Sequence, residues 1–455
     1  MPFLDALRSR LPELRVLDDP VDLESHRRDE TPYLAAGMPI GVAVPTSTSE
    51  VQAIVRLAAE HRVPLVPRGA GTGLSGGANA VDGGLVVSFA RMDRIVEIDR
   101  DNLAAVVQPG IVNATLKAAV AAEGLFYPPD PASYESCTIG GNLGTNAGGL
   151  CCVKYGVTRD SVLGLEVVVA DGAIVRTGGK TVKDVAGYDL TRLFVGAQGT
   201  LGLITEATLR LRPAPPPKST LLAFFDSLAA AGNAVSGLVT RGVQPCTLEL
   251  MDRFTIAAVD DWQHLGLDRE AAGMLLIESD LPGAAAGAEL DVAAEVCQAA
   301  GATSVVRSAD PTEADWLRQA RRMAFHALER LGEVRMEDVG VPRSRVTEML
   351  GEIERIAARH GLTCGVFGHI GDGNLHPNFV VARDDPDAAR RVTAASADLY
   401  RAAVALGGTV TAEHGIGSSR RAFLELQRGP EAVRVMRAIK DALDPLGILN
   451  PGKVL

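Results

Sequence analysis

Histidines and an acidic residue gather in two short motifs near the C-terminal end of the chain. His369 and His376 flank a glycine-rich turn, and Glu413 directly precedes His414. We expect GVFGHI and LHPNFVV to form a hairpin with the four-residue turn Gly371–Asn374, which places His369 opposite His376. Directly opposed residues have Cβ atoms about 4.5–5.5 Å apart. Two imidazoles and one carboxylate at that spacing are a common ligand set for a divalent metal ion.

Glu413 is the predicted third ligand, and its neighbour His414 has a different predicted role. If the chain stays extended there, successive side chains alternate in direction, so His414 points away from the ion and can serve as a base. A cross-strand histidine pair held by structural hydrogen bonds is the alternative. The second motif, Glu413-His414, favours the metal site.

Two glycine-rich segments in the N-terminal half could hold phosphate groups. Residues 67–77 read PRGAGTGLSGG and residues 140–149 read GGNLGTNAGG. The first contains the G-x-G-x-x-G pattern, but a strand rather than a helix is expected to follow, which argues against a Rossmann fold. Successive backbone N–H groups in such a loop can instead surround an anion, with Arg68 adding charge. A loop that is merely rich in turns is the alternative.

The elements that must position these residues follow from the pattern of apolar residues. Met1–Arg15 is expected to form a short amphipathic helix, and short strands recur from Gly41, with a hairpin at Asp171-Gly172. Pro213–Lys218 (PAPPPK) is the predicted linker, because its prolines block both helices and strand ladders. Beyond it, strands alternate with alanine-rich helices, and a last helix is expected over Glu431–Leu443. Domain boundaries are therefore expected near residues 215 and 410.

Composition and charge exclude several classes of protein. The 455 residues carry a net charge of −11 without a basic run, which argues against a nucleic-acid partner. The six cysteines include no C-x-x-C pair, which argues against an intrinsic iron–sulfur cluster and favours reduced thiols. No transmembrane segment or signal peptide is expected. We therefore expect a cytoplasmic protein, with association at the face of the inner membrane as the alternative.

Three segments together resemble a known family: PRGAGTGLSGGA, PPDPASYESCTIGGNLGTNAGGLCCVKYG and GAQGTLGLITEATLRLRP. They are similar to the PCMH-type FAD-binding domain of the vanillyl-alcohol oxidase superfamily. The chain resembles its FAD-linked oxidase branch, which contains glycolate oxidase catalytic subunits, D-lactate dehydrogenases and D-2-hydroxyglutarate dehydrogenases. The resemblance implies an α+β fold with a PCMH-type FAD-binding domain, a ferredoxin-like substrate (cap) domain and a C-terminal helical segment that returns to the flavin.

The resemblance also implies domain limits and a flavin site. The FAD-binding domain would span residues 1–215 with its core at 37–215, the cap domain residues 216–410, and the C-terminal segment residues 411–455. No histidine lies between His61 and His264, so non-covalent FAD is expected. The residues matched to the FAD site are Arg68, Gly69, Ala70, Gly71, Thr72, Gly73, Leu74, Ser75, Pro129, Asp130, Thr138, Gly141, Gly144, Thr145, Asn146, Gly148, Ile204 and Asn450.

The resemblance also assigns catalytic roles to residues of the C-terminal motifs. The resemblance implies that His369, His376 and Glu413 bind one divalent ion, zinc or alternatively manganese or iron. It also implies that Arg321 binds the substrate carboxylate, although an ordinary basic helix face is the alternative. We predict oxidation of a small D-2-hydroxy acid to its 2-oxo acid. His414 would take the hydroxyl proton, and hydride would pass to the flavin N5.

The choice of substrate and of partners follows from single features. Met336 stands where the 2-hydroxyglutarate enzymes carry a lysine, which favours glycolate, D-lactate or a larger apolar acid. D-2-hydroxyglutarate dehydrogenase, an ether-lipid-synthase-like flavoenzyme without net redox and a non-catalytic FAD-binding subunit are the alternatives. The expected electron acceptor is a quinone, an electron-transfer flavoprotein or an iron–sulfur subunit rather than oxygen. A homodimer and a subunit of a multi-chain complex are both compatible with the sequence.

Overall fold

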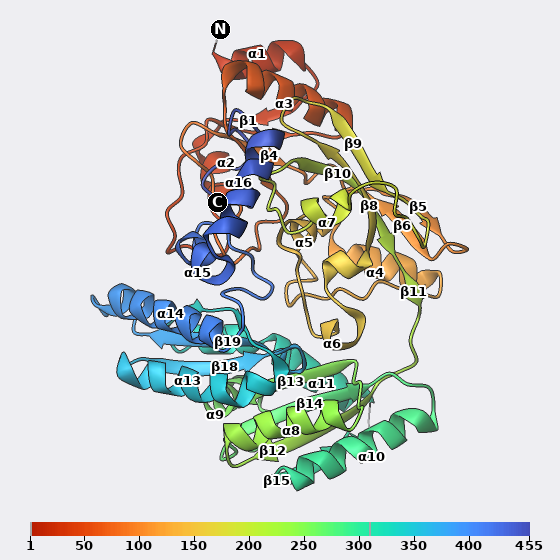
Figure 1. The fold of residues 1–455 in the computed structure, drawn as a ribbon, viewed down its shortest axis with the longest axis vertical. Helices are drawn as coiled ribbons and strands as arrows, with labels where there is room; N and C mark the ends of the chain where they lie inside the picture. The colour runs from red at the N-terminus through yellow and green to blue at the C-terminus, as the bar shows by residue number, and fades with distance from the viewer. Residues whose placement is uncertain (1, 309–310) are drawn as a thin grey trace. The chain divides into compact units, whose positions relative to one another are not determined.

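The computed structural model describes residues 2–308 and 311–455. Contacts between residues divide the chain into two compact units (Figure 1). Unit 1 consists of Met1–Gly148, Gly156–Ala214 and Glu413–Leu455, and unit 2 consists of Gly149–Tyr155 and Pro215–Ala412. Both units combine helices with sheets, which confirms the predicted α+β class.

Unit 1 contains two main sheets. The first has the order β1-β2-β4-β3, in which β2, β4 and β3 run parallel and β1 is antiparallel. The second has the order β5-β6-β10-β8-β9 and is antiparallel throughout. Its β8–β9 pair is the hairpin predicted at Asp171-Gly172. The strands are β1 (Arg15–Leu17), β2 (Gly41–Val44), β3 (Leu65–Arg68), β4 (Leu85–Ser88), β5 (Ile95–Asp99), β6 (Ala104–Val107), β7 (Leu125–Phe126), β8 (Val162–Val168), β9 (Ile174–Gly178), β10 (Leu203–Arg210) and β11 (Arg212–Pro213).

The helices of unit 1 cover these sheets with their apolar sides. Leu7 of α1 and Ile54 of α3 pack in one core with Leu85 of β4, and Ser47 caps α3 by accepting from the Glu50 N–H. The first helix is shorter than the predicted Met1–Arg15, and Met1 lies outside the described residues. The helices are α1 (Phe3–Arg10), α2 (Pro20–Ser25), α3 (Thr48–His61), α4 (Asn113–Ala122), α5 (Ile139–Thr145), α7 (Leu190–Phe194), α15 (Leu424–Arg428) and α16 (Pro430–Leu443), with 3-10 turns η1 (Thr158–Ser161) and η4 (Arg421–Phe423).

Unit 2 is built on an eight-stranded sheet with the order β15-β12-β14-β13-β18-β19-β16, and β17 also pairs with β19. The strands β12, β13, β14 and β15 have the spatial order 4-1-3-2, which is that of a ferredoxin-like fold. This confirms the ferredoxin-like cap, and β18, β19 and β16 extend it beyond β13. The strands are β12 (Ser219–Phe225), β13 (Thr247–Asp252), β14 (Gly273–Ser279), β15 (Ala302–Arg307), β16 (Glu333–Met336), β17 (Val339–Gly340), β18 (Thr363–Gly368) and β19 (Asn374–Val381).

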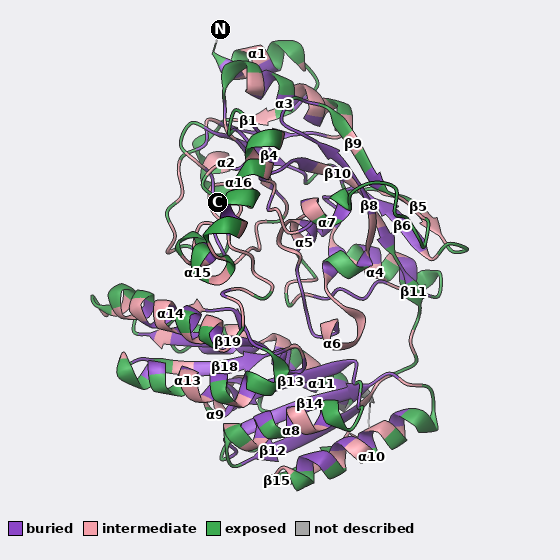
Figure 2. Ribbon diagram, in the orientation of Figure 1, coloured by how far each residue is buried: buried purple, intermediate pink, exposed green. Residues whose placement is uncertain are grey.

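Helices cover both faces of this sheet, so β13 and β14 are buried along their whole lengths (Figure 2). Met274 and Leu276 share a core with residues of α9, α11 and α12, whereas α8 and α10 contact β12 and β14 as well. Near-continuous apolar runs such as GMLLIES are expected for strands covered on both sides. The helices are α6 (Cys152–Tyr155), α8 (Leu228–Thr240), α9 (Arg253–Gln263), α10 (Ala284–Ala299), α11 (Pro311–Arg322), α12 (Ala324–Glu329), α13 (Val346–Arg359) and α14 (Ala388–Ala405), with 3-10 turns η2 (Arg343–Arg345) and η3 (Ile370–Asp372).

The hairpin of β18 and β19 exists, but its predicted register is wrong. His376 pairs with Phe367 rather than with His369, so the register differs by two residues. The chain turns through η3, and Gly373 adopts a φ of 77°, which favours glycine. Because the shift is even, His369 stays on the face that carries His376.

Asp252 gives unit 2 a pH dependence that can be measured. Its carboxylate ends β13, accepts from the N–H groups of Thr255 and Val366 at 2.8 Å each, and is only 8% exposed. Burial raises the pKa of Asp252 from 3.8 to about 6. The folded state therefore binds this proton more tightly than the unfolded chain, so its contribution to stability falls as the pH rises through that interval.

We expect Asp252→Asn to remove this fall in stability between pH 4 and pH 6. The measurement is the free energy of unfolding in urea across that range, compared between wild type and variant. Asp19→Asn, which changes an exposed cap of α2, is the control and should keep the wild-type slope. Parallel profiles for wild type and Asp252→Asn would contradict the prediction.

Candidate flavin and metal sites

The loop that follows β3 offers a row of unused hydrogen-bond donors. Among the described residues, the backbone N–H groups of Gly69 to Ser75 donate to no acceptor of the chain. Arg68 is 8% exposed, and its Nη1 has no hydrogen-bond partner in the described part of the chain. No helix follows before β4, which confirms the argument against a Rossmann fold. A buried guanidinium beside successive free N–H groups fits a diphosphate group.

The second glycine-rich segment packs directly against the first. A Cβ atom on Gly69 would lie within 3.0 Å of the Thr138 hydroxyl, closer than real Cβ atoms approach other atoms. That hydroxyl accepts from the Gly141 N–H at 3.2 Å and so caps α5. Glycine at position 69 is therefore required for the two loops to meet.

Asn450 comes from the C-terminal end of unit 1 and binds the same region. Its Nδ2 donates to the carbonyl groups of Gly77 at 2.9 Å and Gln198 at 2.7 Å. The side chain is 1% exposed, and its Oδ1 has no hydrogen-bond partner among the described residues. A buried acceptor left over in this way fits a donor group of a bound cofactor.

Gln198 is a central residue that sequence analysis did not single out. The backbone N–H of Gln198 donates to the Gly144 carbonyl, and its side-chain Nε2 donates to the Ser75 hydroxyl. The side-chain Oε1 accepts from the Gly417 N–H at 2.8 Å. The residue is buried and adopts a φ of 51°. It lies within the quoted segment GAQGTLGL, but a glutamine in a glycine-rich segment carries no chemical signal by itself.

The other residues assigned to the flavin lie at separate points of unit 1. Asp130 is buried, and the Pro129 carbonyl accepts from Asn113 at 3.2 Å. Thr145 ends α5, and Asn146 follows in the left-handed region with a φ of 56°. Ile204 lies in β10 opposite Val167.

Glu413 and His414 do not lie in a strand, so the expectation of alternating side chains is wrong. Both residues form bends, and the His414 Nε2 lies 3.9 Å from the Glu413 Oε1. The Ser75 hydroxyl donates to the His414 carbonyl at 2.9 Å. A Cβ atom on Gly148 would lie within 3.0 Å of the Glu413 Oε2. Within unit 1, Glu413 and His414 therefore lie against the two glycine-rich loops.

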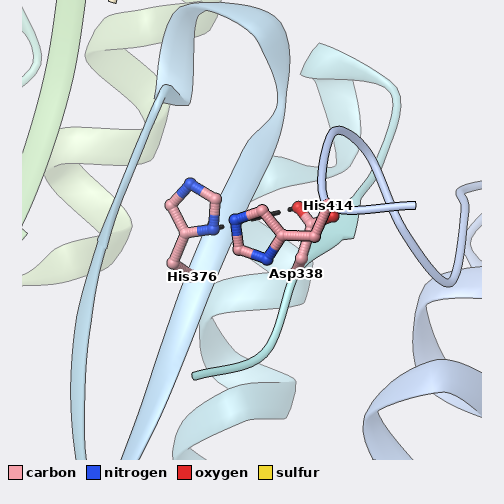
Figure 3. Close-up of side chains that lie close together, drawn as sticks. All are labelled: Asp338, His376 and His414. Atoms are coloured by element: carbon pink, nitrogen blue, oxygen red, sulfur yellow. Dashed lines mark ion pairs between the residues drawn. The ribbon is translucent and has the colours of Figure 1, made fainter. Parts of the chain in front are cut away.

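In unit 2 the histidine pair is buried beside two carboxylates. The ring centroids of His369 and His376 are 5.3 Å apart, and both residues are at most 6% exposed. The Nδ1 of His369 lies 2.7 Å from the Glu249 Oε1. The Nδ1 of His376 lies 3.8 Å from the Asp338 Oδ1 (Figure 3). Histidine ligands of metal ions commonly have such a carboxylate at the other ring nitrogen.

Asp338 is held in place by several donors of unit 2. It accepts from the Asn374 Nδ2 at 2.7 Å, the Thr411 hydroxyl at 2.7 Å and the Ala412 N–H at 2.8 Å. Ala412 is the residue directly before Glu413. Sequence analysis did not single out Asp338, because its partners are distant in the chain.

Arg321 is not on a solvated basic face. It is 4% exposed in α11, its Nη2 lies 2.6 Å from the Glu249 Oε2, and its guanidinium lies 4.6 Å from the centre of the Phe367 ring. Glu249 therefore contacts both Arg321 and His369. A planar guanidinium fixed by a carboxylate and an aromatic ring suits recognition of a substrate carboxylate.

Comparison with known proteins identifies the family. A family model described as the C-terminal domain of FAD linked oxidases matches residues 214–454, and one described as an FAD binding domain matches residues 39–178. The chain belongs to the FAD-linked oxidase family. The predicted FAD cofactor and the predicted flavin-dependent oxidoreductase class are thereby confirmed.

Relatives and a solved structure cover nearly the whole chain. Glycolate oxidase subunit GlcD of Bacillus subtilis (strain 168) is 46% identical, over 94% of this chain and 91% of its own length. D-lactate dehydrogenase of Archaeoglobus fulgidus is 36% identical, over 95% of this chain and 96% of its own length. The solved structure of p-cresol methylhydroxylase is 18% identical, over 99% of this chain and 96% of its own length, with a TM-score of 0.82. That last likeness shows the fold alone, and it confirms the PCMH-type architecture.

The close approach at Gly69 leads to a prediction about FAD. A methyl group in Gly69→Ala would displace the Thr138 hydroxyl from the first turn of α5, so the purified protein should retain less FAD. The ratio of flavin to protein absorbance measures this. Gly179→Ala is the control, because open space surrounds its Cβ position. Equal FAD content in the two variants would contradict the proposed role of the loop.

Proposed function

We propose that this chain oxidises a small D-2-hydroxy acid, such as glycolate or D-lactate, to its 2-oxo acid with FAD and one divalent ion. The observation that carries the proposal is the buried group of His369, His376 and Arg321 in unit 2, each beside a carboxylate. The names of the relatives, a glycolate oxidase subunit and a D-lactate dehydrogenase, support this class of substrate.

The ion would be held by His369, His376 and Glu413. Two buried imidazoles fit this role, and the carboxylate 2.7 Å from the Nδ1 of His369 orients that ring for metal binding. Zinc is the proposed ion, with manganese or iron as alternatives. When bound, the ion supplies Lewis acidity and FAD supplies the two-electron acceptor.

Two side chains would act on different groups of the substrate, its carboxylate and its hydroxyl. Arg321 would bind the carboxylate through its N–H groups, in the orientation set by Phe367 and Glu249. His414 would take the hydroxyl proton on an imidazole nitrogen. The resulting imidazolium would be stabilised by Glu413, whose Oε1 lies 3.9 Å from the His414 Nε2.

Met336 bears on the charge of the substrate. This half-buried residue pairs with Asn378 at the end of β16 and carries no charge. A second substrate carboxylate would lack a cation there, which favours a monocarboxylate over 2-hydroxyglutarate.

The electrons would leave for a quinone, an electron-transfer flavoprotein or an iron–sulfur subunit. A relative named as a subunit supports assembly with other chains. Among the described residues, no helix is long and apolar enough to cross a membrane.

Removal of the ion should stop turnover. We expect the FAD-loaded chain to reduce an artificial dye with glycolate or D-lactate, to lose this activity in EDTA and to regain it with zinc or manganese. L-lactate and D-2-hydroxyglutarate serve as comparison substrates. Full activity after complete metal removal would exclude the proposed role of the ion, and no activity with any 2-hydroxy acid would exclude the substrate class.

His414→Ala should lower kcat by about 10²–10⁴-fold, the range typical of a general base. The FAD content should not change, because the contact with Ser75 uses the His414 backbone carbonyl. His326→Ala, which removes an exposed histidine paired with Glu329, is the control. Turnover of His414→Ala at the wild-type rate would refute its role as the base.

A further inference from the structure

We propose that Glu249 is a positioning residue that orients His369 for metal binding and Arg321 for substrate binding at the same time. This inference rests on the proposed function, because it assigns Glu249 a role toward two residues of that site. It adds a residue for which sequence analysis gave no role.

The sheet fixes where Glu249 points. In the pairing of β13 with β18, Leu250 lies opposite Gly368 and Met251 opposite Phe367. Continued by one residue, this antiparallel register places Glu249 opposite His369. Glu249 also shares its face with Met251, which packs in the core formed with α9, α11 and α12. Arg321 lies in α11, so the carboxylate lies between the helix and the hairpin.

The two oxygen atoms of Glu249 have separate tasks. Oε1 lies 2.7 Å from the His369 Nδ1, and Oε2 lies 2.6 Å from the Arg321 Nη2. The Glu249 side chain is 1% exposed and that of Arg321 4%, so water does not compete for these contacts. A buried carboxylate shared by two groups holds both at fixed positions, and a shift of either one is felt by the other.

The contact with Glu249 also determines which nitrogen of His369 can bind a metal ion. An ionised carboxylate only accepts hydrogen bonds, so the His369 Nδ1 must carry the proton. The lone pair of the neutral ring then lies on Nε2. Without Glu249 the ring could protonate at either nitrogen and rotate, and metal affinity would fall.

The first experiment compares the affinity for manganese in FAD-loaded wild type and Glu249→Gln. Glutamine keeps the size of the side chain but removes its charge and presents N–H donors toward Arg321 or His369. We expect the Mn²⁺ dissociation constant, measured by electron paramagnetic resonance, to rise by on the order of 10–100-fold. The KM for D-lactate should rise as well, because Arg321 loses its partner.

Glu337→Gln is the matched control. Glu337 is a buried carboxylate of the same unit that accepts from the Ser396 and Tyr400 hydroxyl groups. Its variant loses the same charge without touching His369 or Arg321, so the Mn²⁺ affinity and KM should stay at wild-type values. Equal Mn²⁺ affinity in wild type and Glu249→Gln would overturn the inference.

A second measurement needs no variant and therefore does not depend on how Glu249→Gln folds. Nitrogen NMR of metal-free wild type with labelled histidine reports which ring nitrogen of His369 carries the proton, after assignment with His369→Gln. A proton on Nδ1 supports the inference, and a proton on Nε2 overturns it. If wild type binds no Mn²⁺, the proposed metal site fails. The NMR result for His369 still decides whether Glu249 orients that ring.

Discussion

The carboxylate of Glu249, buried between an imidazole and a guanidinium, is the contact on which the chemistry of unit 2 depends. A charge in an apolar core is costly unless it is paired and hydrogen-bonded, and removal of one partner of a buried pair typically costs several kcal/mol, about 3–5. Glu249 forms an ion pair with Arg321 through one oxygen and a hydrogen bond with His369 through the other. Both partners lie outside the four ferredoxin-like strands, because Arg321 lies in α11 and His369 directly follows β18. The added hairpin of β18 and β19 supplies His369 and His376, and its pairing with β13 brings His369 beside the Glu249 carboxylate.

Unit 1 is under a different constraint, because it must leave space and free hydrogen-bond donors for a large anionic cofactor. Glycine permits close approach of the two loops at Gly69, and the absence of a side chain at Gly148 accommodates Glu413. Gln198 and Asn450 then connect these loops with the C-terminal part of the unit. The buried hydrogen bonds of these two residues explain why segments far apart in sequence belong to one unit.

Local pattern was sufficient to predict the strands around the linker, the β8–β9 hairpin and the terminal helix α16, whereas the α+β class of the whole chain came from the resemblance. The pattern also predicted that His369 and His376 lie close together, but the predicted register of the two strands was wrong. Counting outward from a tight turn could not anticipate η3, whereas the even shift of two residues preserved the common face. The extended conformation expected for Glu413 and His414 was wrong because hydrogen bonds with Ser75 and Gln198 bend the chain there. Glu249, Asp338 and Gln198 were missed because each acts through partners that only the folded chain brings near.

The central claim is that His369, His376 and Glu413 hold one divalent ion together. The most direct measurement is an anomalous difference map from crystals of the FAD-loaded protein grown with zinc. We predict a single strong peak about 2.0–2.2 Å from the Nε2 atoms of both histidines and from a carboxylate oxygen of Glu413. A map without a peak at these atoms, or with zinc bound to the Nδ1 of His369, would contradict it.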